Sequence, residues 1–499
     1  MARRIKALLI WLHLYLGIAL CLLFLVWFVS GIAMVYYRTP VLTDAQRIAT
    51  VPAISRVPSQ APAAIAPLAA AWPSAEGIHL GQLHDRPIWR WRTNTNGWSA
   101  AWADDASGAH FDGPALLEDA RRWLNSSDAQ FIGEYTADDQ WTYFTALRPH
   151  YPVLRYSTGG TLHRDVYFSS RTGEPVSATT PVSRALYYLG PGLHYFSFYP
   201  IRNRDQLWRN LVNWSSGIGT LVCLFGLIVG IWRIRWDAIG TARQVLPFKK
   251  FWMYWHHWVG LAFGVFATTF VLSGLFSMNP AKIFPETTIP KALQQAWLGG
   301  RPQISALPAL PSELAHSHEI SFAQLAGNAQ LIGLIPGSPR RLFVSTPTGW
   351  EAHPPYSENE IRASIQPLLS RPLASIEQLE GFDTYYYARK DNEKPLPALR
   401  LRLGDERDTW YYADPATGAL FLKSDYGTRA RRWLYNGLHS FDLQSLLNRP
   451  WLWTVVIWGL SLIGIALSVT STMVSWHWLK RWAARRRKRR LAERLPSPA

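Results

Sequence analysis

The chain has 499 residues, a net charge of +17 and a mean hydropathy of -0.05, values that together suggest a soluble basic protein. That class is excluded, because four windows are almost wholly apolar and each exceeds the roughly 20 residues that a helix needs to cross about 30 Å of hydrocarbon. The two cysteines, Cys21 and Cys223, lie inside these windows, which excludes disulfide-stabilised exported domains.

The positive charge is concentrated in three short segments. Residues 1–6, 233–250 and 480–494 hold 17 Lys and Arg against two acidic residues, and the rest of the chain is nearly neutral. Basic segments beside membrane helices mark the cytoplasmic side, so both termini and the 233–250 connection are predicted to be cytoplasmic. The basic run 485–490 follows the end of a predicted helix, where we expect it to meet anionic lipid, and nucleic acid is not an expected partner.

The first half of the chain predicts two membrane helices around a large polar segment. The first apolar window is too long for a signal peptide and ends without a small-residue cleavage site, so we expect a retained helix. In chain order we predict a transmembrane helix (7–37), an exported domain (38–190), a Gly-Leu-His-x-Phe segment at the outer interface (191–206) and a second transmembrane helix (207–232).

The second half repeats this order. After a cytoplasmic loop (233–250) we predict a third transmembrane helix (251–278), a second exported domain (279–433), a second Gly-Leu-His-x-Phe segment (434–450), a fourth transmembrane helix (451–478) and a basic cytoplasmic tail (479–499).

The two halves share identical residues at a fixed spacing. His13, Gly17 and Ser30 recur 243 positions later as His256, Gly260 and Ser273. Arg155, Gly173 and His194 recur 245 positions later as Arg400, Gly418 and His439. Two crossings per half make the repeats parallel, related by a pseudo-two-fold axis along the membrane normal. The predicted fold is therefore a membrane protein with four transmembrane α-helices in two tandem parallel repeats, each with an exported α+β domain.

Local patterns support the α+β assignment. Residues 152–167 and 396–412 have the aromatic and β-branched content of strands, each followed by a Thr-Gly turn. Segments 115–125 and 357–370 are typical of helices, the second with a capping Ser357 and Glu360 three residues on. The Ala- and Pro-rich stretch 51–75 is predicted to be a linker or loosely packed.

This order of motifs resembles the PepSY-associated transmembrane family over nearly the whole chain, least at about 40–130, and the exported segments resemble PepSY-type domains. The resemblance implies a protein of the bacterial inner (cytoplasmic) membrane with two large periplasmic domains. It further implies an iron-regulated membrane protein or a ferric-siderophore reductase that holds two b-type haems between its helices. Members differ in role, so the resemblance does not fix the substrate.

Four histidines match this implication because they form two repeat-related pairs. His13 and His256 lie at similar depths, the first about 9 Å inside its helix, and are expected to face each other across one haem near the cytoplasmic side. His194 and His439 are expected to hold a second haem at the outer boundary. Two imidazoles saturate haem iron, which gives an electron carrier. The simpler alternative is that each histidine only satisfies hydrogen bonds within the membrane.

Other histidines are given smaller roles. His257 and His477 have no histidine at the equivalent position, and we interpret them as interfacial or supporting residues, either of which could replace a named ligand. Gly17 and Gly260, one turn after His13 and His256, suit either close approach of a porphyrin or close helix packing. The remaining histidines are interpreted as solvated: His79, His84, His110, His150, His163, His316, His318 and His353. For His316 and His318, which are two residues apart, a metal site is the alternative interpretation.

The sequence thus predicts a di-haem b electron-transfer protein that acts as a ferric-siderophore (ferric-chelate) reductase, with no catalytic side chain assigned. Electrons would enter at the cytoplasmic haem, pass to the outer haem and reduce a periplasmic ferric siderophore. The electron donor stays open between a quinol, a soluble flavoprotein and a cytoplasmic reductase. One alternative is a non-redox membrane anchor whose PepSY-like domains bind peptides or regulate a protease. An iron transporter is disfavoured because the predicted helices contain almost no Asp or Glu.

Overall fold

The computed structural model describes residues 2–37, 39–93, 95–240, 245–300, 303–369, 372–389 and 394–492. Two residues of the predicted basic segments, Arg243 and Arg494, lie outside the described residues. The chain divides into two compact units, each built from separate stretches of sequence. We call them the helical unit (1–38, 185–284 and 430–499) and the sheet unit (39–184 and 285–429).

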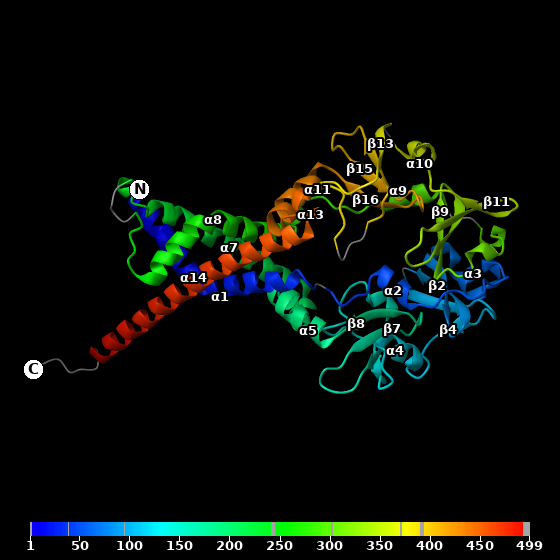
Figure 1. The fold of residues 1–499 in the computed structure, drawn as a ribbon, viewed down its shortest axis with the longest axis horizontal. Coiled ribbons are helices and arrows are strands. Elements are labelled where there is room, and N and C mark those ends of the chain that lie inside the picture. The colour runs from blue at the N-terminus through cyan, green and yellow to red at the C-terminus, as the bar shows by residue number, and fades with distance from the viewer. Residues whose placement is uncertain are drawn as a thin grey trace, which may run out of the picture. The chain divides into compact units, whose positions relative to one another are not determined.

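The helical unit is a bundle of four long apolar helices (Figure 1). They are α1 (Ala2–Met34), α7 (Asp205–Trp232), α8 (Phe251–Ser277) and α14 (Pro450–Ala492). Helix α1 packs against α7 and α14, and α8 packs against the same two helices. Among the described residues, these four helices have the length and composition to cross a membrane, as the sequence predicts. Helix α14 has 43 residues, about 65 Å, so it runs beyond any membrane span into the basic segment.

Each predicted Gly-Leu-His-x-Phe segment begins with a π-helical turn, a feature that often marks functional positions. The turns are η4 (Tyr188–Gly192) and η10 (Arg432–Gly437). Short helices surround them: α5 (Pro181–Tyr187), α6 (Tyr199–Arg202), α11 (Tyr426–Arg431), α12 (Leu438–Ser440) and α13 (Gln444–Leu447).

An eight-stranded antiparallel sheet runs through both halves of the sheet unit. Its strand order is β12 (Gly349–His353), β11 (Arg341–Thr346), β10 (Asn328–Leu334), β9 (Glu319–Leu325), β1 (Glu76–Leu83), β2 (Arg86–Thr93), β3 (Gly97–Trp102) and β4 (Gly108–Ala109). The two halves meet where β1 pairs with β9, in the register His79 with Ser321 and Leu80 with Ile320. This pairing joins residues about 240 positions apart into one sheet.

Each half also has a four-stranded antiparallel sheet. One contains β5 (Gln130–Tyr135), β6 (Val153–Ser157), β7 (Asp165–Ser169) and β8 (Pro175–Thr179), and the other contains β13 (Leu373–Leu379), β14 (Ala398–Leu403), β15 (Trp410–Ala413) and β16 (Leu420–Ser424). After β7 and β15 the chain turns at Gly173 and Gly418, both with φ of +69°, a conformation that favours glycine.

The helices of the sheet unit are short. They are α2 (Asp44–Thr50), α3 (Ala66–Ala71), α4 (Leu117–Leu124), α9 (Lys291–Leu298) and α10 (Glu358–Ile365). The prediction of helices near 115–125 and 357–370 is confirmed, and α10 begins with the expected capping box of Ser357 and Glu360. The 3₁₀ turns are η1 (Pro62–Ala64), η2 (Trp72–Ser74), η3 (Arg148–His150), η5 (Trp236–Ala238), η6 (Pro280–Lys282), η7 (Ile304–Ala306), η8 (Ser312–Leu314) and η9 (Gln366–Leu368).

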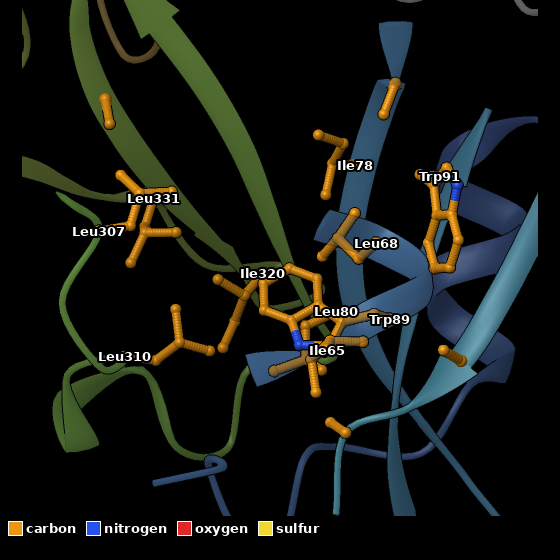
Figure 2. Close-up of a cluster of buried hydrophobic side chains, with 14 of the residues drawn as sticks. Ile65, Leu68, Ile78, Leu80, Trp89, Trp91, Leu307, Leu310, Ile320 and Leu331 are labelled. Carbon is orange, nitrogen blue, oxygen red and sulfur yellow. The ribbon is translucent and has the colours of Figure 1, made fainter. Parts of the chain in front are cut away.

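The prediction that 51–75 is a loosely packed linker is wrong. Four of its large apolar side chains, Ile54, Ile65, Leu68 and Trp72, are buried in a core that also takes residues from both halves of the eight-stranded sheet. Figure 2 shows Leu68 beside Leu80 of β1, with Ile320 of β9 in the same cluster. The prolines limit this stretch to short helical turns, and burial of its large apolar side chains against the sheet holds it in place.

Candidate functional site

The helical unit brings together the first predicted histidine pair. His13 of α1 and His256 of α8 have ring centroids 6.3 Å apart and ring planes inclined by 25°. The Nδ1 of His13 donates to the carbonyl oxygen of Val222 on α7 at 3.0 Å. The Nδ1 of His256 lies 3.4 Å from the hydroxyl of Thr470 on α14, which itself donates to a helix carbonyl. All four long helices therefore position this pair.

The second predicted pair also meets within the helical unit. His194 and His439 have ring centroids 6.0 Å apart and an interplanar angle of 71°. The Nδ1 of His194 lies 3.0 Å from the Ser30 hydroxyl of α1, and that of His439 lies 3.3 Å from the Ser273 hydroxyl of α8. The Nδ1 of His439 also lies 3.0 Å from the carbonyl oxygen of Phe270. Ser30 and Ser273 are one of the repeated pairs found in the sequence.

These contacts favour one position for the proton on each imidazole ring. Each serine or threonine hydroxyl beside a histidine already donates to a helix carbonyl, so it can only accept from the imidazole. A carbonyl oxygen likewise only accepts. The arrangement therefore favours the Nδ1–H tautomer, most directly for His13 and His439, whose partners are carbonyl oxygens, and leaves the lone pair on Nε2 available to a metal.

The spacing within each pair fits one iron ion between two imidazoles. A ring nitrogen binds a metal ion at about 2 Å, which places the two ring centres about 6 Å apart. The observed separations are 6.3 Å and 6.0 Å.

A cavity of about 360 Å³ surrounds the first pair. It is lined mainly by apolar side chains together with His13, His256, Gly17 and Gly260. A Cβ atom added at Gly17 would meet no other atom within 4 Å, so this glycine faces open space rather than a tightly packed helix. The apolar lining and this open face suit a flat, largely apolar group such as a porphyrin.

His257 and His477, which have no histidine at the equivalent repeat position, make hydrogen bonds elsewhere in the helical unit. His257 is buried and lines the cavity, but its Nε2 donates to the carbonyl oxygen of Gly230 at 2.8 Å. His477 is exposed, and its Nδ1 donates to the carbonyl oxygen of Met473, one turn earlier on the same helix. Neither takes part in the two histidine pairs.

The histidine pairs lie toward opposite ends of the bundle. His13 and Ser30, which contacts His194, are 17 residues apart on α1, and His256 and Ser273 have the same separation on α8. At 1.5 Å per residue this is about 25 Å along each helix, close to the thickness of the hydrocarbon core.

The sheet unit contains a buried charged cluster that the sequence interpretation missed. His79 of β1, Glu174 after β7 and Glu319 of β9 offer three ligand atoms within 4.8 Å of one another. The Nη1 of Arg47 lies 2.6 Å from Glu174 and 2.7 Å from Glu319. Arg90 of β2 lies 3.7 Å from Glu174. Two guanidinium groups thus balance the two carboxylates, which is typical of a structural ion network.

The interpretation of His79 as a solvated histidine is therefore wrong, because its side chain is buried. The signal that could have identified it is its place in an apolar strand, Gly77-Ile78-His79-Leu80, instead of a polar loop. Its partners could not be identified in the same way, because Glu319 lies 240 residues away and reaches His79 only through the β1–β9 pairing.

Burial and charge act in opposite directions on this cluster. Burial lowers the pKa of His79, but the carboxylates of Glu319 and Glu174 raise it by more, so the net pKa lies above its ordinary value. Burial raises the pKa of Glu174, but Arg90, Arg47 and His79 more than reverse this and hold it well below its ordinary range. The two carboxylates thus favour the protonated form of the His79 imidazole, and the surrounding cations favour the ionised form of Glu174.

We expect the stability of the sheet unit to fall as pH rises above about 6.5. A group whose folded pKa is raised stabilises the fold fully below its unfolded pKa and loses that effect as pH rises through the folded pKa. One proton can contribute a slope of at most about 1.4 kcal/mol per pH unit. Hydrogen exchange of β1 and β9 amides in the full-length protein measures the effect. Equal slopes for wild type and His79→Gln would contradict it.

Comparison with known families gives one match. The model of the PepSY-associated TM region matches residues 10–368, which include His13, His194 and His256. A search of curated proteins finds no match. The match covers well over half of the chain and agrees with the four long helices and the α+β sheets. The chain is a membrane protein that belongs to the PepSY-associated TM region family.

Proposed function

We propose that this protein is an electron carrier of the inner membrane with two b-type haems, one held by His13 and His256 and the other by His194 and His439. The observation that supports this most strongly is the two matched pairs, with ring centroids 6.3 Å and 6.0 Å apart and the Nδ1 of each ring engaged. A bis-histidine haem supplies reversible one-electron transfer and leaves no coordination position for oxygen.

The chain's own residues would set the orientation and surroundings of each haem. Ser30 and Ser273 hold His194 and His439 to α1 and α8. Gly226 of α7 allows the His13 ring to pack directly against the α7 backbone, because a Cβ atom at this position would lie 2.5 Å from that ring. The apolar cavity around His13 and His256 excludes water and lowers the local dielectric constant, which is one of the ways in which proteins tune haem potentials.

The repeated sequence and the basic segments complete the proposal. In it the two halves are parallel repeats, both termini are cytoplasmic, and the two PepSY-like domains lie in the periplasm. Electrons would pass from a cytoplasmic or quinol donor to the first haem, then to the second, and reduce a ferric siderophore to release Fe(II). Reduction is chemically suited to release, because hard oxygen ligands hold Fe(III) more tightly than Fe(II).

The test is a reduced-minus-oxidised absorption spectrum of the full-length protein, purified in detergent after expression with ample haem. We expect a b-type spectrum and about two haems per chain, followed by oxidation of the reduced protein when a ferric siderophore is added. A colourless protein would contradict the haem proposal and favour a non-redox anchor that binds peptides or regulates a protease. A haem protein that is not reoxidised would retain the electron-transfer role and reject the siderophore.

A further inference from the structure

The two halves of the sheet unit differ at one pair of corresponding positions. In the first half, Ser157 of β6 lies opposite Asp165 of β7. The residues 245 positions later are Arg402 of β14 and Trp410 of β15, which are opposite each other in the same register. A serine–carboxylate pair in one half is thus an arginine–indole pair in the other.

In the first half the carboxylate has a clear role. The Asp165 side chain is fully buried and accepts from the Nη2 of Arg155 at 3.0 Å and from the Nη1 of Arg184 at 3.3 Å. It also lies 2.9 Å from the Nδ1 of His163. Asp165 is therefore the common acceptor for two arginines from separate elements.

The second half keeps both arginines but not this acceptor. Arg400 and Arg429 correspond to Arg155 and Arg184, and Arg402 adds a third guanidinium. All three pack against the ring of Trp410. The distance from the guanidinium carbon to the ring centroid is 4.8 Å for Arg400, 4.0 Å for Arg429 and 4.5 Å for Arg402. An indole attracts cations through its π face but accepts no conventional hydrogen bond.

Nearby carboxylates satisfy this group only in part. Arg400 pairs with Glu377 and Asp383, and Arg429 pairs with Asp408. Arg402 makes no ion pair with a carboxylate among the residues that the structure describes. Two guanidinium nitrogens, the Nε of Arg402 and the Nη1 of Arg429, are buried without a hydrogen-bond partner.

We propose that this arginine cluster, formed by Arg400, Arg402 and Arg429 around Trp410, binds an oxyanion, a carboxylate or phosphate, of a small ligand. The ligand would supply to the second half the acceptor that Asp165 supplies to the first. Oxyanions are the acceptors that guanidinium groups bind most strongly, often with two N–H groups at once. The proposal does not depend on the haem sites.

Arg400 and Arg402 lie on β14, Trp410 on β15 and Arg429 on α11 (Figure 1), and of these four side chains Arg402 is the most exposed. Arg402 is half-buried, and Tyr426, whose ring lies 5.0 Å from the Arg429 guanidinium, is 61% exposed. Trp410 itself is buried against the arginines, so the site is expected to recognise charge and oxygen geometry rather than an aromatic ring.

Isothermal titration of the full-length protein in detergent, at fixed ionic strength, tests the proposal with citrate and inorganic phosphate as separate probes. We expect at least one probe to bind with one site per chain. Stronger binding of citrate would identify a carboxylate ligand, and stronger binding of phosphate would identify a phosphorylated one. Absence of one-to-one binding by both probes would overturn the proposal.

Three variants locate the site. Arg402→Ser installs the first-half residue and should weaken binding at least tenfold. Trp410→Asp supplies an internal carboxylate, as Asp165 does, and should weaken binding to the same degree while the protein remains folded. Arg92→Ser removes one exposed arginine and matches the change in charge of Arg402→Ser, so its affinity should stay within twofold of wild type. Equal affinities of Arg402→Ser and Arg92→Ser would overturn the assignment, whatever the folding of Trp410→Asp.

Discussion

Replacing His13 by alanine is expected to lower the haem content of the purified protein from about two per chain to about one. The Nδ1 of His13 donates to the Val222 carbonyl oxygen, so in the proposed site Nε2 would bind the iron. No other histidine among the described residues has a ring centroid as close as 6.3 Å to His256 in this arrangement. Loss of the His13 imidazole therefore leaves His256 without its partner in the proposed haem site. The pyridine haemochrome absorbance, divided by the protein concentration, measures the number of haems per chain.

Two matched variants make this expectation specific. His477→Ala removes an exposed imidazole that bonds only to its own helix, and it should retain two haems. His257→Ala removes the buried neighbour whose Nε2 is occupied by the Gly230 carbonyl, and it should also retain two. If His13→Ala kept both haems while His257→Ala lost one, the pairing in the cavity would be wrong.

Replacing Arg47 by alanine is expected to destabilise the sheet unit by about 3–5 kcal/mol. The Arg47 guanidinium bridges Glu174 and Glu319, whose side chains are only 3% and 7% exposed. Without it, two buried carboxylates face each other with Arg90 and His79 as the remaining cations. Removing one partner of a buried ion network is costly, because the other charges stay desolvated. Because Glu319 belongs to the second half of the unit, the junction of β1 and β9 should loosen first.

The matched control for Arg47→Ala is Arg92→Ala. Arg92 pairs with Glu76, but the two side chains are 44% and 49% exposed, so the pair should contribute at most about 1 kcal/mol. Chemical unfolding of the full-length variants, followed by hydrogen exchange at β1 and β9, compares the two. Similar losses for both arginines would show that the buried cluster contributes no more than a surface pair.

Features that depend on local composition, or on identical residues at a fixed spacing, could be predicted from the sequence. Uniformly apolar length predicted α1, α7, α8 and α14, because a helix in lipid must satisfy its own backbone and present apolar side chains on all sides. Ser357 and Glu360 predicted the start of α10, because a capping box involves only neighbouring residues. The repeat spacing selected the two histidine pairs that the bundle then brings to about 6 Å.

The tertiary structure alone decided the features that depend on partners distant in sequence. The stretch 51–75 has the composition of a linker, yet Ile65 and Leu68 are buried because a sheet from both halves covers them. His79 became part of an ion network only when β1 paired with β9 and brought Glu319 to it. The replacement of Asp165 by Trp410 is visible in the sequence, but only the strand register shows that three arginines meet there. Local signals fix an element, whereas the energy of a buried charge or apolar group depends on what the rest of the chain places against it.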